Sequence, residues 1–81
     1  MSLEWRRRGS IDVDRYARIH DGWMTYCAVL PRDMDLAAAC ADFAASAKYT
    51  KADGDAVECD ATLVERGRDV EQQRMTVSGR S

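Results

Sequence analysis

The chain has 81 residues, of which 46% are hydrophobic and 32% charged, and its formal net charge is −2. A chain of this length supports one hydrophobic core and is too short for a second, so we expect a single domain over residues 1–81. The composition excludes a disordered chain, and the low net charge argues against a general attraction to nucleic acid or membranes.

The apolar pattern indicates neither a membrane span nor a secretory leader. The longest unbroken apolar run, residues 36–41, is far shorter than the roughly 20 residues that a membrane-spanning helix needs. Cys27, Cys40 and Cys59 form neither a disulfide framework nor a CxxC motif, so we expect reduced thiols packed as small hydrophobes. We therefore expect a cytoplasmic protein.

Residues 12–30 predict a β-hairpin. Asp21-Gly22 separates two alternating stretches, and this dipeptide favours the type I′ turn of a two-residue loop. With those two residues in the loop, His20 pairs with Trp23, and the remaining pairs follow in register. One face of the hairpin is then apolar apart from Arg15, and its members are Ile11, Val13, Ala17, Ile19, Met24, Tyr26, Ala28 and Leu30.

A helix is expected over residues 34–48, after Pro31 ends the second strand. Asp33 suits the N-cap, and Asp35 places negative charge in the first turn, where the helix dipole favours it. Four apolar residues recur with the spacing of one helical face: Leu36, Cys40, Phe43 and Ala47. We expect this face to pack against the sheet.

A second hairpin is expected after the polar turn of residues 51–55. An apolar face formed by Val57 and every second residue up to 63 alternates with polar residues, as in a half-buried strand. A two-residue loop would set this face beside Arg74 and Thr76. A three-residue loop over residues 65–67 would set it beside Met75 and Val77. We prefer the three-residue loop because it gives glycine the last loop position, and we expect the final strand over residues 70–78.

These elements predict an α+β fold in which one helix packs on one face of an antiparallel sheet of four or five strands. Leu3, Trp5 and Arg7 alternate with charged residues, so residues 2–8 form either a short extra strand or a free arm. The element order is (β)ββαββ. The order of the strands within the sheet is left open.

No catalytic, cofactor or metal motif is present. The sequence has no phosphate-binding loop, dinucleotide-binding glycine motif or serine-hydrolase elbow. His20 and Cys27 lie too far apart in the predicted hairpin for a nucleophile and base, and one His with three scattered Cys lacks the spacing of zinc ligands. Asp53 and Asp55 lack the other ligands of a calcium loop. We therefore expect a non-enzymatic protein with no cofactor or bound metal.

Two surfaces are candidates for partner binding. The outer face of the first hairpin combines aromatic and basic residues, which are enriched at binding hot spots. It would contact a foreign partner, be covered by the N-terminal segment with Trp5 stacked on Trp23, or form a homodimer. The second surface is acidic and includes the helix, since residues 33–65 hold eight acids against two lysines. The predicted partner-binding residues are Tyr16, Arg18, His20, Trp23 and Thr25 on the hairpin, and Asp35 and Asp42 on the helix.

A nucleic-acid-binding accessory protein is the first alternative. The arginines at positions 6–8 would contact phosphates, and the hairpin aromatics would stack on bases. The acidic net charge and the lack of an RNA-recognition signature argue against it. A homodimeric structural protein is the second alternative.

In its size, its lack of catalytic motifs and its compact αβ organisation, the chain resembles the small phage-encoded antidefence proteins, anti-CRISPRs among them. The resemblance is one of general character and carries over no residues. It implies an inhibitor that occupies a surface of a host nucleoprotein complex. We therefore expect a non-enzymatic protein-binding module, an inhibitor of this phage type.

Overall fold

The computed structural model describes residues 2–22, 24–46 and 56–78. Within these ranges the elements are β1 (Arg15–His20), β2 (Thr25–Val29), α1 (Leu36–Ala45), β3 (Ala56–Glu65) and β4 (Arg68–Ser78). The strands form one antiparallel sheet with the order β2-β1-β3-β4. The predicted α+β fold is confirmed in its four-stranded form. Residues 2–8 contribute an isolated bridge at Arg6 in place of the optional extra strand.

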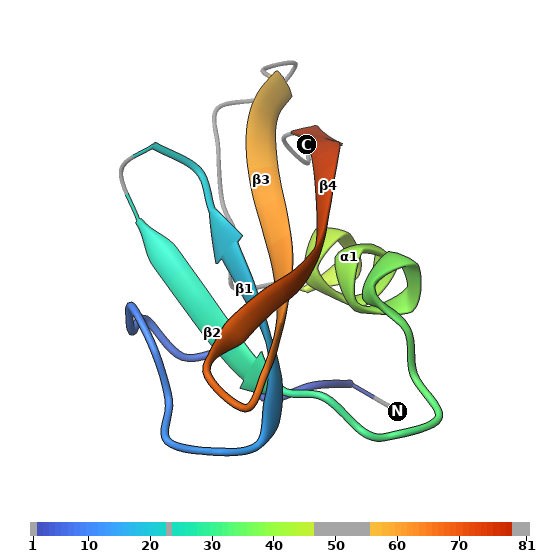
Figure 1. Cartoon of the computed structure of the whole chain (residues 1–81). Coiled ribbons are helices and arrows are strands. Elements are labelled where there is room, and N and C mark those ends of the chain that lie inside the picture. Colours follow the sequence, from blue (N-terminus) through green and yellow to red (C-terminus); the bar gives the residue numbers. More distant parts are fainter. Residues whose placement is uncertain (1, 23, 47–55, 79–81) are drawn as a thin grey trace.

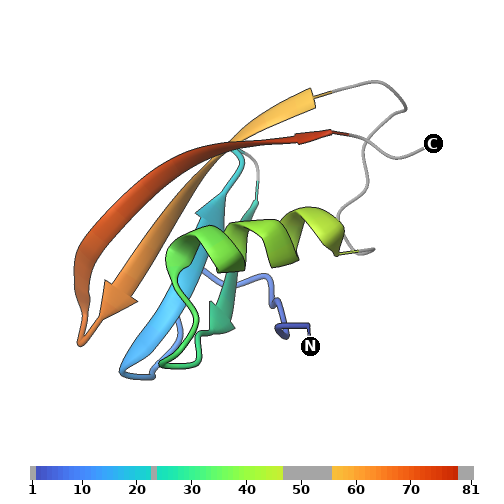
Figure 2. The same cartoon turned by 90° about the vertical axis from the view of Figure 1, so that its right-hand side faces the viewer.

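The helix α1 lies on one face of the sheet, where it contacts β1, β3 and β4 (Figure 1). Figure 2 shows the long β3–β4 hairpin arching over one side of α1. Between the two layers lies the main core, because each element turns its apolar side chains inward. Its members include Ala17, Ile19, Ala28, Leu30, Leu36, Cys40, Phe43, Cys59, Ala61, Leu63 and Val77.

The first hairpin is offset by two residues from its predicted register, and His20 pairs with Thr25. The pair that closes the loop is Asp21 with Met24. The Asp21 amide donates to the Met24 carbonyl at 3.1 Å, and the Asp21 Oδ1 accepts from the Met24 amide at 2.6 Å. Gly22, with φ +91°, therefore opens the loop in a conformation that other residues rarely adopt. A shift of two residues leaves every side chain on its predicted face.

Arg15, the charged residue on the otherwise apolar face, marks the start of β1. Its guanidinium donates to the Pro31 carbonyl, to the Met34 carbonyl at 2.9 Å and to the Glu65 carboxylate at 3.0 Å. These contacts tie the connection that leads into α1 to the end of the sheet.

The predicted apolar face extends too far toward the N-terminus, because β1 begins only at Arg15. Val13 is 39% exposed, and Ile11 packs on the other face of the sheet. Both residues precede the strand, so the alternation that placed them on the inner face does not apply to them. Their predicted place in the main core is wrong.

The helix begins two residues later than predicted, and its N-cap is Asp35 rather than Asp33. The Asp35 carboxylate accepts from the Ala38 amide at 2.9 Å. The Met34 amide donates to the Pro31 carbonyl, so this turn keeps the chain out of the helix until Asp35. The predicted stripe of Leu36, Cys40 and Phe43 is buried. Its fourth member, Ala47, and the end of the predicted helix lie outside the described residues.

The second hairpin has a two-residue loop, so the predicted three-residue loop is wrong. Glu65 pairs with Arg68, and both loop residues have positive φ, +52° at Arg66 and +78° at Gly67. Two successive positive φ angles are the requirement of a type I′ turn, whose twist matches that of the flanking strands.

A β-bulge then corrects the register of β4. Val64 pairs with Asp69 but Leu63 pairs with Glu71, so Val70 is left without a cross-strand partner. One extra residue inverts every later side chain of the strand, since the period is two. Residues 75 and 77 therefore face α1, and the predicted inner position of Met75 and Val77 is confirmed.

Candidate functional site

The N-terminal segment, residues 2–14, wraps around the edge of the sheet at β2. The Arg6 amide donates to the Cys27 carbonyl at 2.9 Å, and the Arg6 carbonyl accepts from the Cys27 amide at 2.8 Å. On the helix side, the Trp5 ring meets Phe43 edge-on at 5.0 Å and donates its indole N–H to Asp42 at 2.9 Å. The segment thus covers the middle of the β2 edge.

The same segment also covers one end of the outer face, the face turned away from α1. Tyr16 is only 5% exposed there, and it forms a small second core with Cys27 and Val64, against which Ile11 packs. The Cys27 thiol donates to the Arg8 carbonyl at 3.2 Å. Tyr16, a predicted partner-binding residue, thus packs the N-terminal segment onto the sheet and presents little surface.

The rest of the outer face carries what we call the polar row, a line of four side chains that crosses all four strands. Registered pairing aligns Thr25 with His20, His20 with Asp60, and Asp60 with Arg74. Directly opposed residues of neighbouring strands share a face. The His20 Nδ1 lies 2.8 Å from the Thr25 Oγ1, and the Arg74 Nε donates to the Asp60 Oδ1 at 3.4 Å.

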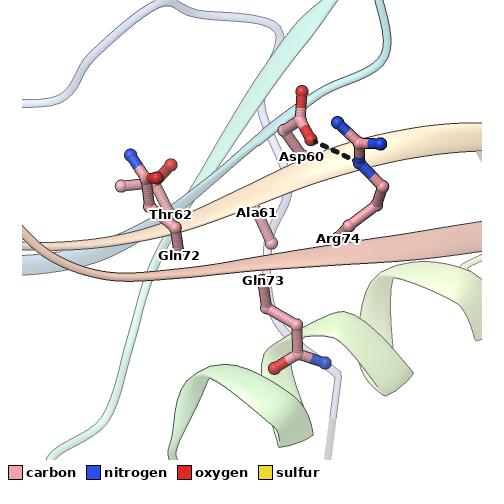
Figure 3. Close-up of a pocket in the computed structure, with 6 residues that line it drawn as sticks. All are labelled: Asp60, Ala61, Thr62, Gln72, Gln73 and Arg74. Atoms are coloured by element: carbon pink, nitrogen blue, oxygen red, sulfur yellow. Dashed lines mark hydrogen bonds and ion pairs between the residues drawn. The ribbon is translucent and has the colours of Figure 1, made fainter.

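A second line of polar residues lies beside the polar row. Arg18 is opposite Thr62, and Thr62 is opposite Gln72. The Arg18 guanidinium donates to Asp69 at 3.3 Å, so its charge is balanced within the molecule. Figure 3 shows Thr62 and Gln72 on the same side of the β3–β4 ribbon as the Asp60–Arg74 pair, whereas Gln73 points toward α1. An open depression runs along these residues of β3 and β4.

The polar row ends at β4, the second edge of the sheet, and no segment of the described chain pairs with the outer side of β4. Hydrogen-bonding direction alternates along each strand. Because the Cys27 backbone bonds outward to Arg6, its registered partner Arg18 must bond toward β3. Thr62, the partner of Arg18, then bonds toward β1, so Gln72, the partner of Thr62 on β4, has its backbone amide and carbonyl on the open side of β4. Every second residue points the same way, so three residues of β4 present these groups at the open edge: Gln72, Arg74 and Thr76.

The two acidic residues predicted on the helix surface have roles within the fold. Asp35 caps α1, and Asp42 accepts from the Leu3 amide at 3.0 Å in addition to the Trp5 indole. They lie on the opposite side of the sheet from the polar row. The structure therefore brings together Arg18, His20 and Thr25, but not Asp35 or Asp42. Trp23 and the acids at positions 53 and 55 lie outside the described residues.

Among the described residues, no cluster of three or more His, Cys, Asp or Glu side chains would hold a metal ion. Cys27, Cys40 and Cys59 are buried free thiols. The described helix is not long and apolar enough to cross a membrane. The groups that the outer face offers are hydrogen-bond donors and acceptors, which suit recognition of a polar partner.

Comparison of the chain with protein-family models, curated proteins and solved structures found no match. The site therefore rests on its own geometry. Asp60, Gln72 and Arg74 were not among the predicted partner-binding residues. Their place beside His20 depends on the pairing of β1 with β3, for which the sequence offers no local signal.

Proposed function

We propose that this protein is a non-enzymatic protein-binding module that takes up an extended segment of a partner protein along the open edge of β4. The observation that carries the proposal is the difference between the two edges. The β2 edge is bridged by the N-terminal segment, whereas the β4 edge has no partner within the described chain. An exposed edge of this kind is where extended peptides add a strand, with main-chain hydrogen bonds supplying affinity.

The side chains beside the β4 edge would supply specificity. Gln72, Arg74 and Thr76 are exposed on the outer face, next to the place of the added strand. Charged residues on an edge discourage indiscriminate pairing, and β4 carries Arg68, Asp69, Glu71 and Arg74. A partner strand therefore needs polar and charged residues that complement this pattern. Arg18, His20 and Thr25 stay predicted contacts for the parts of a partner that reach across the outer face.

The nucleic-acid alternative has less support from the geometry. Arg18, Arg74 and Arg6 are each paired with a carboxylate, which weakens their attraction for phosphates. Tyr16 is buried and offers no ring for base stacking. The narrower role of a phage-type inhibitor of a host nucleoprotein complex rests on the general resemblance alone. A second copy of this chain is the other occupant that β4 would accept.

The proposal is tested by affinity capture of the tagged protein from a lysate of the organism that encodes it, with nuclease treatment. A parallel measurement of the molar mass of the purified protein reports self-association. We expect a stoichiometric partner protein that survives nuclease, and a monomeric mass for the purified chain. A partner lost on nuclease treatment would support nucleic acid binding. A dimeric mass together with capture of the bait alone would support the homodimer.

A further inference from the structure

A hollow opens at the Arg15 end of β1, between the β3–β4 turn and the connection into α1. Its lining is predominantly charged. Arg15 and Glu65 bind each other across it at 3.0 Å. We call it the arginine hollow, and it is lined by Asp14, Arg15, Arg32, Glu65, Arg66, Arg68 and Val70.

Three of its arginines form no ion pair with any residue that the structure describes. They are Arg32, Arg66 and Arg68, and all three are exposed. Four arginines against two acids give the hollow a local charge of +2. This excess is unusual in a chain whose formal net charge is −2. Unpaired arginines grouped around one concave site favour an oxyanion, because the guanidinium fork matches its oxygens.

Arg66 stands in the β3–β4 turn at a position whose backbone conformation disfavours arginine. Its φ of +52° is the left-handed conformation, which the first position of a type I′ turn reserves for Asn, Asp or Gly. The conformation is held from outside the turn, since the Arg66 amide donates to the Asp14 carbonyl at 2.7 Å. A side chain kept where the backbone disfavours it is an indicator of function. Here the side chain adds a guanidinium to the rim of the arginine hollow.

We propose that the arginine hollow binds the phosphate group of a phosphate monoester, with Arg32, Arg66 and Arg68 as donors. At neutral pH such a group carries a charge of about −1.5 to −2, which balances the local excess. A phosphate monoester also presents three acceptor oxygens to the three unpaired arginines. The hollow lies at the Arg68 end of β4, away from Gln72, Arg74 and Thr76, whose backbone groups face the open edge, so either proposal can fail without the other.

The test is a titration of the ¹⁵N-labelled protein with inorganic phosphate, followed by NMR, against sodium chloride at matched ionic strength. We expect saturable shifts at the amides of Arg66, Gly67 and Arg68 and at arginine Nε–H groups. R66N and R68Q should each weaken binding about tenfold, the loss of one charge-assisted contact. Asn suits the turn, so R66N keeps the fold. The matched control is R74Q, which removes an exposed arginine of the polar row and should leave the affinity unchanged.

Two further ligands identify the source of the phosphate. A nucleoside monophosphate and a phosphoserine peptide present the same group, and the tighter of the two shows which class the site serves. Shifts that are equal in phosphate and chloride would overturn the proposal. So would phosphate binding that is unchanged in the R66N/R68Q double variant, or that R74Q weakens as much as R68Q does.

Discussion

Asp42 holds the N-terminal segment against the molecule with one carboxylate oxygen. Its Oδ2 accepts from both the Leu3 amide and the Trp5 indole. These donors are partly buried, so loss of the acceptor leaves two N–H groups without their partner. We therefore expect Asp42 to help hold Trp5 against Phe43 and, with it, the N-terminal segment over the β2 edge.

Substitution of Asp42 tests this role. D42A should lower the free energy of unfolding by about 2 kcal/mol, because both donors lose their partner. D42N keeps one acceptor oxygen and should cost less. Urea unfolding measures both values, and loss of protection of the Cys27 amide from hydrogen exchange reports release of the segment. A D42A variant with wild-type stability would show that the Asp42 hydrogen bonds to Leu3 and Trp5 do not stabilise the fold.

The buried thiols give the stability a dependence on pH. Burial raises the pKa of Cys27, partly offset by the charge of Arg18. Burial also raises the pKa of Cys40, with smaller contributions from Cys59 and Glu71 in the same direction. In the unfolded chain these thiols lose their protons near pH ~8.5, while the folded protein retains them. The unfolded state then binds fewer protons, so stability falls as the pH rises above that value.

We expect each thiol to remove up to about 1.4 kcal/mol of unfolding free energy per pH unit in this alkaline window. Urea unfolding at a series of pH values from neutral to alkaline measures the slope. C40A removes one titrating thiol, so its stability should fall less steeply than that of the wild type. If the unfolding free energy fell equally steeply with pH in C40A and in the wild type, Cys40 would not contribute to the pH dependence.

At the scale of elements, side-chain faces could be predicted from the sequence and turns could not. The period of two predicted the inner face within the strands of both hairpins, though not at Ile11 and Val13, which precede β1. The period of 3.6 predicted the buried stripe of Leu36, Cys40 and Phe43 on α1. The prediction for the first loop closed it with His20 and Trp23, whereas the hydrogen bonds between Asp21 and Met24 close it one residue further along the chain at both ends. The second was misjudged because the bulge at Val70 had no local signal. Asp35 replaced Asp33 as N-cap because a turn ahead of the helix delays its start.

The bulge at Val70 leads to a deletion test. Removing Val70 leaves Leu63 opposite Glu71 and Val64 opposite Asp69 in a regular ladder, so β4 keeps its inner face. We expect a folded protein whose unfolding free energy changes by no more than about 1 kcal/mol. The control is deletion of Thr62, which shifts β3 against both of its neighbours and should prevent folding. Circular dichroism and cross-strand NMR contacts measure both, and unfolding of the Val70 deletion would contradict the described register.

The turn at Arg66 and Gly67 carries a second prediction at this scale. R66N should raise the unfolding free energy by about 1 kcal/mol, because Asn tolerates a positive φ that arginine avoids. A thermal melt measures the change. Added stability together with weaker phosphate binding is the trade-off expected where strain is kept for function. A variant less stable than the wild type would show that Arg66 contributes contacts beyond the turn.

At the scale of the whole molecule, the described chain covers the β2 edge of the sheet and leaves the β4 edge open (Figure 1). The polar row runs up to the open edge. The sequence predicted that Arg18, His20 and Thr25 share a face, since this follows from alternation along a hairpin. It left open whether the N-terminal segment covers this face, as it does at Tyr16, and it did not predict that Asp60 and Arg74 complete the row. Both depend on contacts between distant parts of the chain. The N-terminal segment packs on β2, and β3 pairs with β1.

The most direct test of strand addition at β4 compares Q72P with Q72A for capture of the partner protein. The backbone N–H of residue 72 points to the open edge, so proline removes it without breaking a bond to β3. Alanine removes the side chain and keeps the N–H. With circular dichroism confirming that both variants are folded, we predict that Q72A retains the partner and Q72P loses at least about tenfold in affinity. Wild-type capture by folded Q72P would contradict binding at this edge.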